Sequence, residues 1–424
     1  MALKRELTKR HVFAVAAGAM ISSGLFVLPY KLVSHGEFGV GSGLAFCYLG
    51  ALILLIPAVV TMAELMTAMP KAGGSFYFID RSLGPGFGTV GGVASWASLA
   101  FKSAFAVVGI AWLIAKWAES MGYAGWGDDS WKVKAVACGF CALFGILNIL
   151  GVKLAGRVQF LLVVVMLAIL WAFVAFGVRA MEWSRFAAVG DVGIQPILKG
   201  MAAVFIAFGG VTKVATLGEE VRDPRRDLVR GMFIACITVG LLYVLVTAVA
   251  SGVLPADGAQ WEPAPLAQAA GTFWGRGGSI VLTLAAIFAF VTTGNAGVMS
   301  ASRIIMAISR DELLPRTLGE VGETGTPVKA IIFTTLFMAG TIVFMDLYVF
   351  VKAASAIMIM VFMFVMLALI LMRESRIPSY KPAWRSPGYP WMQIAGIVGY
   401  VFLLVELGTV PLAVSGVIVG GALV

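Results

Sequence analysis

The chain has 424 residues, of which 60% are hydrophobic and only 12% are charged. A soluble domain carries about a quarter charged residues, so the composition excludes an ordinary soluble enzyme or binding module. The formal net charge of +9 would suit nucleic acid in a soluble protein. Here the basic residues follow the pattern of a membrane topology, and we expect no nucleic-acid partner.

Long apolar runs dominate the chain. A helix needs about 20 apolar residues to cross a bilayer, and short polar links separate about a dozen such runs. The sequence therefore predicts an all-α polytopic membrane protein with about 12 transmembrane helices. In chain order, the predicted crossings are 12–34, 42–68, 86–118, 132–151, 156–178, 198–220, 228–254, 278–309, 328–346, 349–372, 391–409 and 410–424.

The distribution of lysine and arginine predicts the orientation of these crossings. With the N-terminus in the cytoplasm, the links on that side hold more than twice as many basic residues as the links on the other side. Such an excess is typical of cytoplasmic loops. We therefore expect a multi-pass protein of the cytoplasmic membrane with a cytoplasmic N-terminus.

The sequence offers little that could perform covalent chemistry. Cys138 and Cys141 lie in an apolar run and lack the further ligands of a metal site, which favours simple helix packing. His11 and His35 are predicted near opposite membrane faces. No zinc-protease motif, phosphate-binding loop or nucleophile elbow is present. We predict no catalytic residue, no metal and no cofactor.

Two of the predicted crossings are interrupted by small and polar residues. The first contains GAMISSG at 18–24, and the sixth contains AFGGVT at 207–212, at matching places in two successive blocks of five crossings. Glycine and serine pairs lower helix stability. In lipid, a broken backbone persists only where protein or a water-filled cavity satisfies its freed amides and carbonyls.

Such interruptions suit a zwitterionic ligand. A half-helix that begins at mid-membrane directs its free N–H groups toward the gap, which favours a carboxylate, and one that ends there offers carbonyls to an ammonium. Small residues also let neighbouring helices pack closely, which is the alternative explanation for either interruption alone. Two interruptions at corresponding places favour a transport site.

Several strings in the sequence resemble the amino acid, polyamine and organocation transporter family, and they occur in the family's order along nearly the whole chain. They are GAMISSGLFVLP at 18–29, AELMTAMPKAGGSFYF at 63–78, GPGFG at 84–88, LNILGVKLAGRVQ at 147–159, FIAFGGVTKVATLGEEVRDPRRDL at 205–228, SASRIIMAISRDELLPRTL at 300–318 and YKPAWRSPGYP at 380–390. The resemblance implies the inverted-repeat fold also seen in bacterial leucine transporters.

That fold would make residues 1–424 a single transporter domain. The first inverted repeat would cover 12–178, the second would cover 198–372, and a C-terminal helix pair would cover 391–424. The first helix of each repeat would be the broken one.

The resemblance also implies a substrate site. The N–H groups of Ser23 and Gly24 would bind the substrate carboxylate, with Ile21 and Ser22 forming the break beside them. Carbonyls of Met20 in the first helix, and of Ile206 and Gly209 in the sixth, would bind the ammonium. In the third crossing, Ser103 occupies the position from which relatives present a side chain to the substrate.

The sequence departs from the family pattern at two places in this site. Ser22 stands where the family usually has the first glycine of Gly-Ser-Gly, which narrows the freedom of the backbone there. Ile206 stands where many relatives have an aromatic lid over the substrate. Phe205 and Phe208 are both candidates for that lid, and helix packing is the alternative for each.

Two lysines lie inside predicted crossings, Lys102 in the third and Lys213 in the sixth. An ammonium in the membrane is costly, so each is a candidate for ion coupling. Burial favours the neutral amine, which makes proton coupling chemically possible. A lysine that serves only stability through a carbonyl or carboxylate partner is the alternative. Some sodium-independent relatives place a lysine in the fifth crossing, where this chain has Met166.

The sequence therefore predicts a secondary transporter that moves amino acids by alternating access, through proton symport or exchange. Positive charge near the site disfavours cationic cargo, so we expect neutral or acidic amino acids. The alternatives are a sensor that binds amino acids without moving them, and a transporter of cationic amino acids or polyamines. The expected partners are the substrate, the lipid bilayer and protons, and the protein would be a monomer or a homodimer.

Overall fold

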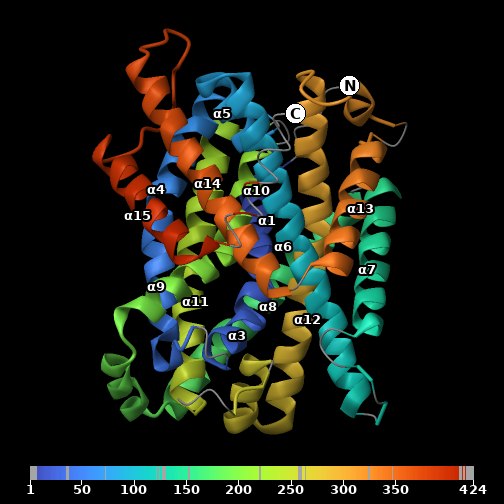
Figure 1. The fold of residues 1–424 in the computed structure, drawn as a ribbon, viewed down its shortest axis with the longest axis vertical. Helices are drawn as coiled ribbons and strands as arrows, with labels where there is room; N and C mark the ends of the chain where they lie inside the picture. The colour runs from blue at the N-terminus through green and yellow to red at the C-terminus, as the bar shows by residue number, and fades with distance from the viewer. Residues whose placement is uncertain are drawn as a thin grey trace.

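A computed structural model describes most of the chain. The described residues are 7–34, 38–71, 73–120, 122–123, 125–126, 130–150, 153–218, 221–255, 260–262, 264–322, 325–345, 347–409, 413 and 416. They form helices joined by short links and contain no strand, apart from an isolated bridge between Leu7 and Val221. The longest helices run along the long axis of the molecule (Figure 1).

The first half of the described chain forms the helices α1 to α8. They are α1 (Lys9–Met20), α2 (Ser23–Phe26), α3 (Leu28–Ser34), η1 (Gly41–Gly43), α4 (Leu44–Ala68), α5 (Ser75–Leu83), α6 (Pro85–Ser120), α7 (Trp131–Leu150) and α8 (Lys153–Ala180). The short α5 was not predicted from the apolar runs, because it is too short and too polar to cross a membrane.

The second half forms the remaining helices. They are η2 (Trp183–Asp191), α9 (Ile194–Val204), η3 (Phe205–Gly210), α10 (Val211–Ala215), η4 (Pro224–Leu228), α11 (Val229–Val253), α12 (Pro265–Arg310), η5 (Arg316–Gly319), α13 (Val328–Phe344), α14 (Leu347–Glu374) and α15 (Trp391–Glu406).

The apolar helices confirm the predicted fold class. Eight helical segments of the described chain are long and apolar enough to cross a membrane, and two shorter apolar helices, α13 and α15, join them. Each predicted crossing from 42–68 to 391–409 coincides with one of these segments. Nearly all of the last predicted crossing, 410–424, lies outside the described residues.

The predicted crossing at 278–309 coincides with the part of α12 that follows a kink. The helix α12 starts at Pro265, and Gly275 interrupts its regular geometry with φ 64° and ψ −160°. Glycine adopts a positive φ without the steric cost that a side chain would bring. The small, polar residues around this kink weaken the apolar pattern, which is why the sequence signal began only at 278.

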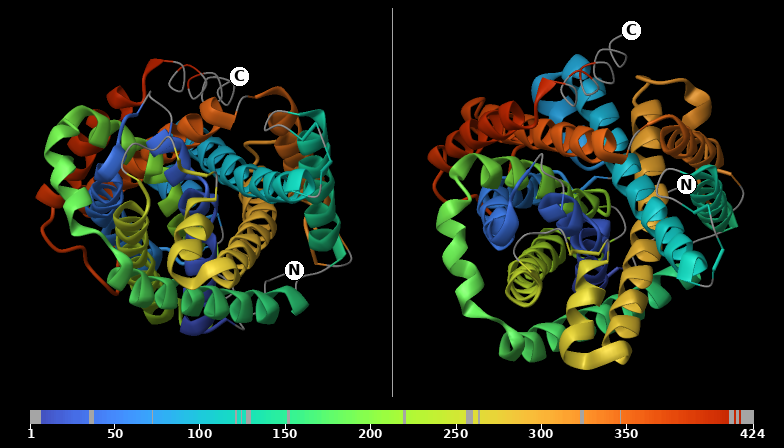
Figure 2. Two further views of the ribbon diagram at one scale, coloured as in Figure 1. Left: turned by 90° about the horizontal axis from the view of Figure 1, so that it is seen from below. Right: turned by 60° about the horizontal axis from the view of Figure 1, so that its bottom comes forward.

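The first helix occupies the interior of the bundle. The helix α1 contacts α8, α11 and α12, as well as η3 and α10 of the sixth crossing. In Figure 2, which shows the molecule from below and in an oblique view, the blue N-terminal segment is surrounded by longer helices. All of its residues from Ala16 to Phe26 are buried, so the interruption predicted at 18–24 lies inside the protein rather than in lipid.

A buried carboxylate connects the segment after α14 to α4. Glu64, near the end of α4, has no exposed surface. Its oxygens accept hydrogen bonds from Arg373 Nε at 2.8 Å, Tyr380 Oη at 2.9 Å and the Ser386 amide at 2.7 Å. Arg373 Nη2 pairs with the second carboxylate oxygen as well, so the contact is bidentate. Burial and the Glu64 carboxylate raise the pKa of Tyr380, which keeps its hydroxyl a donor.

We expect Glu64→Ala to destabilise the protein strongly. Removing one partner of a buried ion pair leaves the other charge without compensation, at a cost of about 3–5 kcal/mol. The midpoint of thermal unfolding in detergent should fall clearly. Glu312→Ala is the matched control, because Glu312 pairs with Arg316 where the two side chains are 67% and 81% exposed. Equal midpoints for the two variants would contradict the assigned role of Glu64.

Candidate functional site

The first helix is broken where the sequence predicted. The helix α1 ends at Met20, and Ile21 and Ser22 follow in extended conformations, with φ and ψ of −70° and 107° for Ile21 and −154° and −162° for Ser22. Helical geometry returns at Ser23. The break frees carbonyls at the end of α1 and N–H groups at the beginning of α2.

Side chains from three other helices pair with the freed carbonyls. Thr293 Oγ1 of α12 lies 3.0 Å from the Gly18 carbonyl oxygen and 3.2 Å from that of Ile21. Tyr243 Oη of α11 donates to the Met20 carbonyl at 2.5 Å. The hydroxyl of Tyr48, in α4, donates to the Gly24 carbonyl. These bonds explain how a broken backbone is stable among apolar helices.

The polar groups at the start of α2 are buried but not all paired. Among the described residues, the hydroxyls of Ser22 and Ser23 have no hydrogen-bond partner. Their side chains are 1% and 0% exposed. A buried polar group without a partner is costly, and in a binding protein it is commonly satisfied by the ligand.

The sixth crossing is irregular but is not unwound like the first, which corrects the expectation of two similar breaks. After α9 ends at Val204, residues 205–210 continue as the 3₁₀ helix η3, and α10 follows directly. Val204 and Gly210 both keep right-handed helical angles. A 3₁₀ helix hydrogen-bonds three residues apart, so it tightens the backbone and redirects its carbonyls without opening the chain.

Small residues bring these two irregular segments into contact. A Cβ atom on Gly210 would lie 2.3 Å from the Met20 nitrogen, and a Cβ on Gly24 would lie 2.7 Å from Ala207 Cβ. Neither position has room for a side chain. The end of α1 and the start of α2 therefore both lie directly against the sixth crossing.

The side-chain amine of Lys102 contacts backbone carbonyls of both segments. Its side chain is 2% exposed, and its Nζ lies 2.7 Å from the Ala207 carbonyl oxygen and 3.5 Å from that of Met20. The Met20 carbonyl, which the sequence analysis assigned to a substrate ammonium, thus lies next to an amine of the protein itself. In the sixth crossing, the carbonyl that pairs with Lys102 belongs to Ala207, which lies between the predicted ligands Ile206 and Gly209.

The Gly209 carbonyl already has a partner, since Thr212 Oγ1 donates to it at 2.8 Å. Ile206 is buried, 1% exposed. No side-chain hydrogen bond to its carbonyl is present in the described part of the chain. Both residues therefore lie next to the site, and neither carbonyl is hydrogen-bonded to an amine among the described residues.

Within the described part of the chain, neither Ser103 nor Lys213 is hydrogen-bonded to the broken first helix, in contrast to Lys102. Ser103 Oγ donates to the Leu99 carbonyl of its own helix at 2.8 Å, and the side chain packs against Gly297 of α12. Lys213 is fully buried, and its Nζ has no hydrogen-bond partner among the described residues.

The two candidate lid residues point to different parts of the molecule. The Phe205 ring packs at 5.2 Å from the Tyr400 ring and 5.9 Å from the Phe362 ring, on α15 and α14. The Phe208 ring packs edge-on at 5.3 Å from the ring of Tyr243, whose hydroxyl binds Met20. Of the two lid candidates, Phe208 is therefore the one that packs against a residue bonded to the break.

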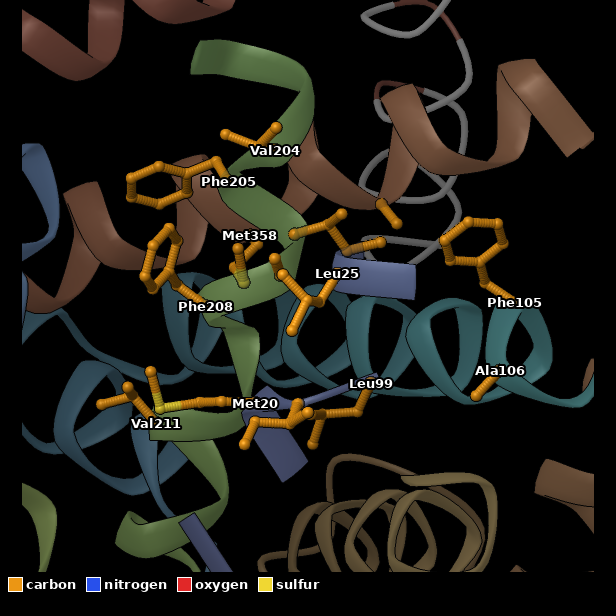
Figure 3. Close-up of a cluster of buried hydrophobic side chains, with 14 of the residues drawn as sticks. Met20, Leu25, Leu99, Phe105, Ala106, Val204, Phe205, Phe208, Val211 and Met358 are labelled. Atoms are coloured by element: carbon orange, nitrogen blue, oxygen red, sulfur yellow. The ribbon is translucent and has the colours of Figure 1, made fainter. Parts of the chain in front are cut away.

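Apolar side chains from several elements surround the polar groups. Figure 3 shows Phe208 and Met358 beside the sixth crossing, with Leu25 facing them and Met20 and Leu99 below. All five are 3% exposed or less. The site thus combines a small polar centre with an aliphatic and aromatic lining, which is the usual composition of a small-molecule site.

Sequence reasoning missed Tyr48, Tyr243, Thr293 and Met358. A signal was present for the tyrosines, because a buried tyrosine hydroxyl in an apolar helix requires a partner. The sequence did not show which carbonyl that partner would be. For metals, the described residues contain no group of three or more His, Cys, Asp or Glu side chains that could hold an ion. His35 lies outside the described residues.

Comparison with known proteins identifies the family. A family model described as amino acid permease matches residues 7–417. The chain belongs to the amino acid permease family. This confirms the resemblance found in the sequence motifs and agrees with amino acid transport as the activity.

Named relatives are moderately similar over most of their length. The branched-chain amino acid permeases BcaP of Lactococcus lactis and of Bacillus subtilis are each 26% identical over 97% of this chain, covering 91% and 90% of the relative. Cationic amino acid transporter 2, vacuolar, of Arabidopsis thaliana is also 26% identical, over 89% of this chain and 62% of its own length.

We expect Gly210→Ala to disrupt the site. Its methyl group would overlap the end of α1, and relieving such overlap typically costs about 1–3 kcal/mol. The midpoint of thermal unfolding should fall. Gly340→Ala in α13 is the matched control, because a Cβ there meets no atom within 4 Å. A Gly210→Ala protein with the unfolding midpoint of the wild type would contradict this geometry.

Proposed function

We propose that the permease moves neutral, aliphatic amino acids by alternating access between the two sides of the membrane. The observation that supports this most directly is the contact of Lys102 Nζ with the carbonyls of Ala207 and Met20. It shows a primary amine bound between the broken first helix and the sixth crossing. A substrate ammonium has the same donors and needs the same acceptors.

The rest of the substrate fits the neighbouring groups. Its carboxylate would accept hydrogen bonds from the Ser23 and Gly24 N–H groups, and from the unpaired hydroxyls of Ser22 and Ser23. An aliphatic side chain would then pack against Phe208 and Met358, which are buried beside the sixth crossing. Burial of such a side chain contributes roughly 1.5–3 kcal/mol to binding.

Charge and lining together favour neutral cargo over cationic cargo. Lys102 and Lys213 are buried amines with no carboxylate bonded to either one among the described residues. A cationic side chain in the substrate would be repelled by either amine in its protonated form, and leucine does not meet this repulsion. The name of the BcaP relatives agrees with an aliphatic substrate, and that of the Arabidopsis relative describes the cationic alternative.

Counterflow into proteoliposomes tests this proposal. We expect vesicles loaded with unlabelled leucine to accumulate labelled leucine, isoleucine and valine, and to accumulate labelled arginine or putrescine at a rate lower by about tenfold or more. Arginine counterflow above that of leucine would favour the cationic alternative. Leucine binding in a thermal-shift assay without any counterflow would instead show a sensor, and labelled glutamate distinguishes acidic from neutral cargo.

The family and the permease relatives give no reason to expect catalysis, and we assign no catalytic residue. We further propose that the N-terminus is cytoplasmic and that the protein resides in the cytoplasmic membrane, on the basis of its excess of basic residues on that side. We propose inverted repeats at 12–178 and 198–372, and a monomer or homodimer as the assembly.

Coupling to protons is the second part of the proposal. Lys213 is buried without a partner among the described residues, and charging such an amine in the membrane is costly. It would take up a proton together with the substrate from the more acidic side and release it on the other. Exchange of one amino acid for another is the alternative coupling mode, and it would not require this proton.

We expect leucine uptake by the wild type to rise as the external pH is lowered below the internal pH. Lys213→Met should remove most of this dependence, because methionine fills the space but cannot carry the proton. Lys329→Met is the control, since Lys329 is an exposed lysine paired with Glu320. A pH profile of Lys213→Met identical to that of the wild type would exclude Lys213 from coupling.

A further inference from the structure

The amine of Lys102 occupies the place that the substrate ammonium needs. A carbonyl oxygen has two lone pairs. The Met20 carbonyl oxygen accepts from Tyr243 Oη at 2.5 Å and lies 3.5 Å from Lys102 Nζ. Lys102 Nζ also donates to the Ala207 carbonyl at 2.7 Å. A substrate ammonium placed between the same two carbonyls would overlap Lys102 Nζ, so the substrate and Lys102 would compete for this position.

A flexible side chain lies beside Lys102 at the sixth crossing. The Cβ of a side chain at Gly209 would lie 2.6 Å from Met358 Sδ and 3.6 Å from Lys102 Cδ. Glycine at this place therefore leaves room for the end of Met358 next to the stem of Lys102. Methionine is flexible and repacks readily, so it can fill the space that the amine vacates.

We propose that Lys102 is a tethered substitute for the substrate ammonium, which lets the substrate-free carrier change sides. This inference rests on the proposed function. Without a cation, the Met20 and Ala207 carbonyls would close into an apolar site incompletely paired, and the closed state of the empty carrier would be unfavourable. With Lys102 Nζ bonded to these carbonyls, the substrate-free carrier can close and reorient to the other side of the membrane. The protein can then perform net transport and is not restricted to exchanging one amino acid for another.

Competition has a second consequence for binding. The substrate binds only to the fraction of molecules in which Lys102 has left the carbonyls, so the apparent affinity is lower than the intrinsic one. Removing the amine should therefore tighten leucine binding while slowing the return of the empty carrier. A residue that only stabilises the fold would not change these two properties in opposite directions.

The experiment compares net efflux with exchange in the same proteoliposomes. Vesicles loaded with labelled leucine are diluted into buffer without amino acid for net efflux, and into buffer with unlabelled leucine for exchange. We expect wild type to show both activities. For Lys102→Met, the ratio of net efflux to exchange should fall about tenfold, and the leucine Kd should fall about threefold or more.

Lys102→Gln, which also lacks the ammonium, is assayed in parallel in case the methionine variant folds poorly. Lys329→Met, at an exposed lysine, should keep the wild-type ratio and Kd. An unchanged or higher ratio in the Lys102 variants, or weaker leucine binding, would overturn the inference. Wild type that exchanges leucine without net efflux would overturn it with no variant needed. Wild type without counterflow would refute the proposed transport function instead.

Discussion

The structure depends on a break in a helix that is buried inside the bundle. At Ile21 and Ser22 the backbone becomes extended among apolar helices. Every carbonyl and N–H group freed there must find a partner in the protein, in a ligand or in enclosed water. Thr293 and Tyr243 supply part of this pairing from two neighbouring helices. The hydroxyls of Ser22 and Ser23 remain without partners among the described residues, and they are the groups to which we assign the substrate carboxylate.

Two glycines allow the broken first helix to contact the sixth crossing directly. Because Gly24 and Gly210 carry no side chain, the start of α2 and the end of α1 both touch the sixth crossing. Larger residues would separate the first helix from the sixth crossing. Close contact instead places carbonyls from both segments within reach of a single amine, that of Lys102. The small residues therefore serve helix packing, and the same close packing creates the site that we propose for the substrate.

The sequence predicted the crossings and the first break because both depend on local composition. An apolar run of about 20 residues requires a helix in lipid, and GAMISSG at 18–24 is an evident interruption of one. The conformation of the sixth crossing was harder to predict, because AFGGVT is compatible both with an unwound loop and with the 3₁₀ helix that is observed. Which carbonyl binds an amine depends on contacts between residues far apart in the chain. Lys102 and Ala207 are an example, and periodicity contains no information about that pair.

Different kinds of interaction hold the two polar regions of the interior. At the end of α4, Glu64 is fixed by a bidentate arginine and further donors, a network that is costly to break. Around the helix break, the bonds are mostly between neutral hydroxyls and carbonyls, each with a net contribution of about 0.5–1.5 kcal/mol. A carrier must exchange such bonds in every cycle, and a ligand shifts the balance between states only by its difference in affinity for them. Because the bonds around the break are weak and replaceable, the free-energy difference between the states stays small enough for the binding of one small substrate to shift it.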